Sequence, residues 1–128
     1  MHTYSETTKD IEVSVTPVYL ENESSPEESV YVFAYNVEIK NKSDKTVQLI
    51  SRHWIITDGD GRTEEVSGPG VIGEQPTLAP GDSHKYQSFC PLRTPTGNMR
   101  GSYQMKAEKD SFDIKVPLFF LRSETILH

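Results

Sequence analysis

The fold class is decided by the segment Val30-Tyr31-Val32-Phe33-Ala34-Tyr35-Asn36-Val37-Glu38-Ile39-Lys40. Side chains on a strand point alternately to its two faces, so every second residue lies on the same side. One face of this segment therefore carries three aromatic and two β-branched residues: Tyr31, Phe33, Tyr35, Val37 and Ile39. A period of two in such residues predicts a strand with one buried face.

Similar alternation recurs on both sides of this segment. Further strands are predicted at 11–16, 46–57, 62–66, 84–90, 102–108 and 112–120. Both faces of 46–57 are partly apolar, which predicts a bulge near Ser51-Arg52-His53. Asp58-Gly59-Asp60-Gly61 predicts a hairpin turn, and 91–101 is expected to be irregular. The pattern predicts an all-β, immunoglobulin- or fibronectin-III-like sandwich of about seven or eight antiparallel strands.

Length and composition limit the class of protein further. The 128 residues suit a single domain, 1–128, with flexible ends at about 1–9 and 122–128. No apolar run approaches the length of a membrane helix, and the N-terminus has no apolar signal region. A single cysteine, Cys90, excludes an internal disulfide. We therefore expect a cytoplasmic protein without a membrane span. The net charge of −6 argues against nucleic-acid binding.

A glycine motif stands between two predicted strands, at Gly68-Pro69-Gly70-Val71-Ile72-Gly73. Its spacing matches a dinucleotide-binding loop, but that loop binds pyrophosphate only where a helix begins behind it. The following residues include Pro76, Pro80 and Pro91 and show no helical periodicity. A turn that needs positive φ at a few positions is the simpler interpretation. An anion-binding nest of N–H groups without a helix stays open.

The residues that could carry chemistry are scattered. The four histidines, His2, His53, His84 and His128, show no close ligand spacing. Cys90 and His84 share a face of one strand but stand about 20 Å apart along it, which is too far for a thiolate pair. We therefore expect no catalytic residue, metal site or cofactor, and interpret Cys90 as a small buried residue.

Taken in order, these and other segments resemble the bacterial ApaG family from about Ile11 to Leu121. The resemblance is carried by 31–35, 53–58, 66–76, 78–81, 86–88 and 94–105. Phe89 departs from it, because many members have glycine before the cysteine. The resemblance implies a fibronectin-III-like sandwich and a link to cobalt resistance and magnesium efflux. It also implies a protein-binding role, since the domain occurs in F-box proteins and a polymerase-delta-interacting protein. It supplies no catalytic residues.

The function expected from these observations is a non-enzymatic binding module that holds a protein or an anion at the loop. The expected contact residues are Gly68, Gly70, Val71, Ile72, Gly73 and Gln75. The two apolar residues among them either tuck under the loop or form an exposed patch. The alternative is an enzyme or sensor for a pyrophosphate-containing nucleotide. The negative charge of the pyrophosphate would be balanced by one of four arginines: Arg52, Arg62, Arg93 or Arg100.

Overall fold

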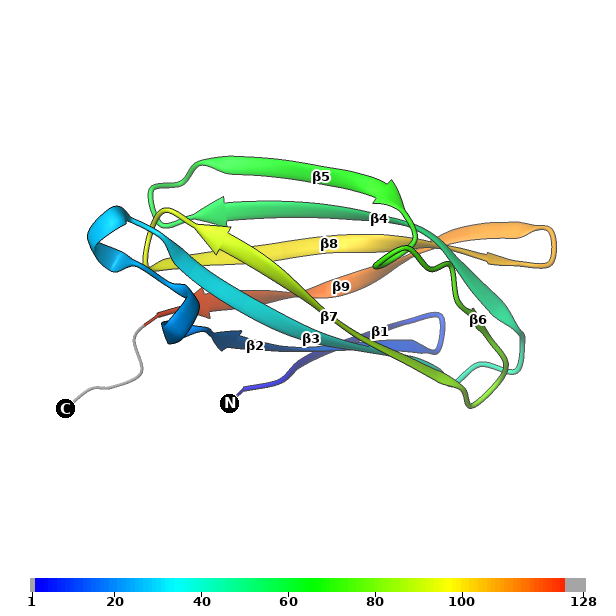
Figure 1. Cartoon of the computed structure of the whole chain (residues 1–128). Coiled ribbons are helices and arrows are strands. Elements are labelled where there is room, and N and C mark those ends of the chain that lie inside the picture. Colours follow the sequence, from blue (N-terminus) through cyan, green and yellow to red (C-terminus); the bar gives the residue numbers. More distant parts are fainter. Residues whose placement is uncertain (1, 124–128) are drawn as a thin grey trace.

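A computed structural model of the chain describes residues 2–123. Within them lie nine strands and two short 3-10 turns, and Figure 1 shows their arrangement. The strands are β1 (Tyr4–Thr8), β2 (Ile11–Tyr19), β3 (Tyr31–Asn41), β4 (Val47–Asp58), β5 (Thr63–Pro69), β6 (Thr77–Leu78), β7 (Ser83–Leu92), β8 (Thr96–Ala107) and β9 (Asp110–Arg122). The 3-10 turns, Glu21–Glu23 and Pro26–Glu28, lie between β2 and β3.

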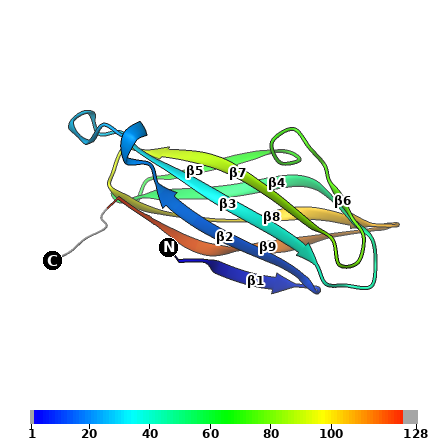
Figure 2. The ribbon, with the colours of Figure 1, turned by 60° about the horizontal axis from the view of Figure 1, so that its bottom comes forward.

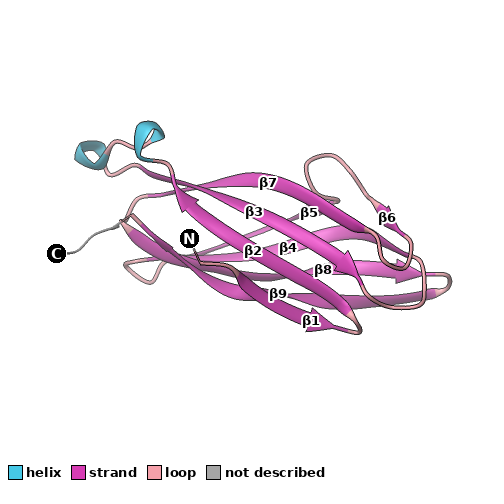
Figure 3. Ribbon diagram, turned by 90° about the horizontal axis from the view of Figure 1, so that it is seen from below, coloured by secondary structure: helices cyan, strands magenta, loops and turns pink. Residues whose placement is uncertain are grey.

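The strands form two antiparallel sheets. One has the order β1-β2-β3-β7, and the other has the order β5-β4-β8-β9, with β6 also paired to β4. Figures 2 and 3 show the two layers packed face to face. The prediction of an all-β sandwich is therefore confirmed, while its closer likeness to fibronectin type III stays a prediction. No helix among residues 2–123 is long and apolar enough to cross a membrane.

The core between the sheets is centred on Trp54. Its ring meets Tyr35, Tyr103 and Phe119 at centroid distances of 5.5, 6.2 and 6.1 Å, in edge-on arrangements that aromatic quadrupoles favour. The side chains come from β3, β4, β8 and β9 and are almost completely buried. This cluster therefore ties both sheets together.

The bulge predicted in the third strand is present. The pairing of β4 with β8 shifts register between Leu49 and Ser51. Because a one-residue shift changes which side chains face the core, the strand buries Leu49 before the shift and Trp54 after it. Arg52 is two residues from Trp54 and therefore also faces inward.

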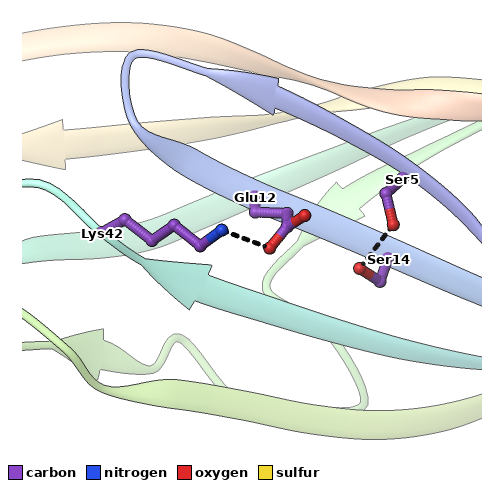
Figure 4. Close-up of polar contacts among 4 residues, drawn as sticks. All are labelled: Ser5, Glu12, Ser14 and Lys42. Atoms are coloured by element: carbon purple, nitrogen blue, oxygen red, sulfur yellow. Dashed lines mark hydrogen bonds and ion pairs between the residues drawn. The ribbon is translucent and has the colours of Figure 1, made fainter.

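The N-terminal segment differs from the flexible end expected at 1–9. Residues 4–8 form β1, which pairs with Ile11–Val15. Ser5 Oγ lies 2.9 Å from Ser14 Oγ, and in the same region Lys42 Nζ lies 2.8 Å from Glu12 Oε1 (Figure 4). Thr8 Oγ1 also accepts a hydrogen bond from the amide of Lys115 in β9, at 3.2 Å. The pairing with β2 and the bonds of Ser5 and Thr8 hold a polar segment that local sequence alone does not mark as a strand.

Two other expected segments also differ. β8 begins at Thr96, so most of the stretch 91–101 is strand and not irregular. A Cβ at Gly101 would collide with the carbonyl oxygen of His53, so this glycine permits close approach of β4 rather than a turn. At the C-terminus, Arg122 belongs to β9, and 124–128 lie outside the described residues.

Candidate recognition site at the glycine-rich loop

The glycine motif forms a tight turn after the end of β5. Val71 and Glu74 exchange two backbone hydrogen bonds, of 2.8 and 3.0 Å. The two residues between them, Ile72 and Gly73, have φ values of 47° and 76°. Two positive values in succession are typical of a type I′ hairpin turn. The next element is the strand β6, so the loop has the strand context that its prolines predict, and Figures 2 and 3 show it standing out from the sandwich.

The local structure explains why glycine stands at each of the three positions of the motif. Gly70 has a φ of 61°, and a Cβ there would overlap the carbonyl oxygen of Glu74. Gly73 occupies the positive-φ position of the turn and has open space around it. Gly68 lies under the guanidinium of Arg52, whose Nη1 would be 3.1 Å from an added Cβ. The spacing of the three glycines therefore follows from backbone geometry and from the packing of one arginine.

Several N–H groups of the loop are already used within the chain. The amide of Gly70 donates to the carbonyl of Ile50 at 2.9 Å, and the amides of Val71 and Glu74 close the turn. Gln75 donates from its side chain to the same Ile50 carbonyl, also at 2.9 Å. Three backbone donors that an anion-binding nest could use are thus already hydrogen-bonded. The side chain of Gln75 connects the loop to β4.

The two apolar residues of the loop differ in solvent exposure. Val71 is 1% exposed and joins the hydrophobic core, whereas Ile72 is 59% exposed at the tip of the turn. The sequence left both arrangements open for this pair, and the structure separates them. Only Ile72 is accessible to another molecule.

Arg52 supports the loop from below. Its Nη1 donates to the carbonyl oxygens of Pro69 and Gly70, both at 3.0 Å. A cavity of about 150 Å³ lies beside it, between β3, β4, β7 and the loop. The lining residues are Tyr35, Arg52, Trp54, Val71, Ile72, Gly73, Tyr86 and Ser88. We call this cavity the Arg52 slot.

Hydroxyl groups give the slot its polar character. Tyr86 and Tyr103 share a hydrogen bond between their hydroxyls across the two sheets. Burial raises the pKa of Tyr86 and of Tyr103 well above the ordinary tyrosine value. Burial also raises the pKa of Tyr35, although a hydrogen bond with Ser88 and the charge of Arg52 act in the opposite direction. The tyrosines are therefore protonated near neutral pH.

The other three candidate arginines lie elsewhere. Arg62 and Arg93 line a separate pocket together with Asp58 and Glu64. Arg100 is exposed on β8, paired with Ile55 of β4. Of the four, only Arg52 touches the glycine loop. Its sequence signal is its position two residues from Trp54 on β4, which puts both side chains on one face.

The remaining reactive groups fit structural roles. Cys90 is 4% exposed, and burial raises the pKa of its thiol to about 11. His53 lies on the outer side of β4, where its Nε2 is 2.7 Å from Glu65 Oε1. Among residues 2–123, no three His, Cys, Asp or Glu side chains gather as a metal site would require.

These features define an all-β sandwich domain with a tight glycine-rich turn beside one open edge. A family model for the ApaG domain matches residues 21–107. Protein ApaG of Paramagnetospirillum magneticum is 56% identical over 121 residues, which cover 94% of this chain and 93% of the relative. Protein ApaG of Mesorhizobium japonicum is 55% identical over 119 residues, 92% of each chain.

Solved structures agree with the sequence comparisons. A crystal structure of a Bordetella pertussis protein described as ApaA is 48% identical. It superposes with a TM-score of 0.88 over 91% of this chain and 96% of its own. The chain therefore belongs to the ApaG family, as the resemblance of its motifs predicted.

Proposed function

We propose that this chain is a non-enzymatic binding module that docks a protein partner at the 67–76 loop. The observation that carries the proposal is the exposure of Ile72, a large apolar side chain presented at the tip of a turn. Exposed apolar groups on a surface favour contact with another protein, because burial removes them from water.

The loop holds Ile72 in a defined position. Its turn is closed by two hydrogen bonds, and Arg52 and Gln75 fasten its flanks to the sandwich. A partner that binds a preorganised loop loses less conformational entropy than one that must order it. The rigidity of the turn therefore favours recognition at Ile72.

An open sheet edge lies next to the same loop. Among residues 2–123, β7 is the last strand of its sheet and pairs with β3 alone. Its residues Tyr86 and Ser88 line the Arg52 slot together with Ile72. Unpaired backbone groups on an edge strand can accept a strand from another chain. The partner thus has an apolar anchor and a hydrogen-bonding edge side by side.

We further propose that the protein acts in the cytoplasm and that its link to cobalt and magnesium handling is indirect, through the docked partner. The cytoplasmic location is supported by the sequence features given above, and the metal link by the family resemblance alone. A metal-transport or metal-sensing protein would then be the component that binds the ion.

The nucleotide alternative has less support. It needs free N–H groups around the glycines, and those of Gly70, Val71 and Glu74 are bonded within the chain. The adjoining slot of about 150 Å³ is also small beside the roughly 300 Å³ at the lower end of small-molecule sites. Docking of a protein fits the loop better.

Affinity capture from a bacterial lysate with Ile72→Asp tests the proposal. Val71 is left unchanged because it belongs to the core. Leu118→Asp is the matched control, since Leu118 is an apolar residue of β9 that is 46% exposed. We expect parent and Leu118→Asp to retain the same partner and Ile72→Asp to lose it. Equal recovery by all three proteins would rule out the loop as the interface.

A further inference from the structure

We propose that the Arg52 slot binds one small tetrahedral oxyanion of the phosphate type. The site lies beneath the loop and uses side chains in place of glycine N–H groups. It goes beyond partner docking at Ile72 and does not depend on it.

Arg52 lies in a row of residues that crosses the inner side of its sheet. Arg52 pairs with Tyr103 of β8 on one side and with Gly68 of β5 on the other. Directly paired residues of antiparallel strands share a face, so these three form one row across the inner side of the sheet. Because Gly68 has no side chain, the guanidinium extends over it toward the open edge of the sandwich.

The guanidinium charge of Arg52 is not balanced by an ion pair with a described carboxylate. Two ion pairs occur among residues 2–123, Lys42 with Glu12 and His53 with Glu65, and neither includes Arg52. Arg52 is half-buried, and its Nη1 donates hydrogen bonds to two backbone carbonyls. A guanidinium carries five N–H donors in a planar fork that suits an oxyanion. A partly buried cation without a carboxylate partner is stabilised by binding an anion.

Hydroxyl-bearing residues surround the slot beside Arg52. The slot is lined by Tyr35, Tyr86 and Ser88, whose hydroxyl-bearing side chains come from β3 and β7. The Tyr86 hydroxyl is paired with that of Tyr103, but such a pair uses only one of its two protons, so one hydroxyl can still donate. Hydroxyl donors that converge with a guanidinium on one cavity are the type of group that surrounds a bound oxyanion. The Trp54 side of the slot is apolar and lowers the local dielectric, which strengthens these contacts.

The size of the slot restricts the ligand. About 150 Å³ leaves room for one compact anion and none for a nucleoside. A tetrahedral anion offers more acceptor oxygens to the surrounding donors than a carboxylate does. Phosphate should therefore bind more tightly than acetate.

Titration of the ¹⁵N-labelled protein with inorganic phosphate, and separately with acetate, tests the site by NMR at constant ionic strength. We expect saturable shifts at the amides of Ile72, Gly73 and Ser88, with half-saturation at a lower concentration for phosphate. Arg52→Met should weaken phosphate binding at least about tenfold, because charge-assisted hydrogen bonds are lost. Arg100→Met, which removes an exposed arginine, should leave binding unchanged.

Ser88→Asp provides a second variant that keeps Arg52 and its bonds to the loop. The new carboxylate would pair with Arg52 and occupy the slot, so phosphate binding should again fall at least about tenfold. Ser88→Ala removes one hydroxyl without adding a charge, so it should weaken phosphate binding less than Ser88→Asp does. The proposal is overturned if phosphate gives no saturable shifts, if acetate binds as tightly as phosphate, or if Ser88→Asp binds phosphate like the parent protein.

Discussion

Substitution of Gly70 tests whether the glycine motif is required by the geometry of the turn. In Gly70→Ala the new Cβ would overlap the carbonyl oxygen of Glu74. This oxygen closes the turn because it accepts a hydrogen bond from the amide of Val71. A positive φ at alanine costs about 1–2 kcal/mol. Relief of the overlap also disturbs the two Val71–Glu74 hydrogen bonds, each worth about 0.5–1.5 kcal/mol. We expect a total loss of about 2–5 kcal/mol.

Gly73→Ala is the matched control for this prediction. Gly73 has a similar positive φ of 76° but no atom within 4 Å of an added Cβ, so its loss should be limited to the backbone cost of about 1–2 kcal/mol. Urea unfolding followed by the fluorescence of Trp54, the single tryptophan, measures both variants. Equal stability of the two variants, or a neutral Gly70→Ala, would refute the steric explanation of the motif.

Three further predictions concern the core, the buried thiol and the loop tip. Trp54→Ala should lower the free energy of unfolding by about 3–5 kcal/mol in urea melts followed by circular dichroism, because the core aromatic cluster loses its centre. Burial raises the pKa of Cys90 from 9.0 to about 11, so its contribution to stability is complete below pH 9 and is lost as the pH rises to 11. Between these values the parent should lose about 2–3 kcal/mol more than Cys90→Ala, and parallel pH profiles would contradict this. Ile72→Asp should change stability by less than about 0.5 kcal/mol, because its side chain is exposed; a larger loss would mean that Ile72 helps to hold the fold.

Much of the fold could be predicted from local patterns. Alternation in 30–40 predicted β3, and apolar residues on both faces of 46–57 predicted the bulge in β4. β1 was missed because its residues, Tyr-Ser-Glu-Thr-Thr, are mostly polar and gain their stability from pairing with β2 and contact with β9. Gly101 was interpreted as part of an irregular segment, since a glycine that permits a close strand crossing looks the same in sequence as a turn glycine.

The candidate site could be predicted in part. Proline spacing placed the glycine motif between strands, which the structure confirms, but it could not separate buried Val71 from exposed Ile72. Which of the four arginines lies beside the loop depends on the pairing of strands that are far apart in sequence. One sequence signal for Arg52 was present, because it lies two residues from Trp54 on the predicted strand and so shares its face.

Photo-crosslinking from position 72 in living cells tests the central claim most directly, that the loop tip is a protein-docking surface. A photo-reactive residue at position 72 should give one discrete cross-linked product, and excess parent protein should suppress it while excess Ile72→Asp protein does not. The same residue at position 118, also an exposed apolar site, should give no such product. Cross-links from position 72 that are absent, or no different from those at position 118, would contradict the account.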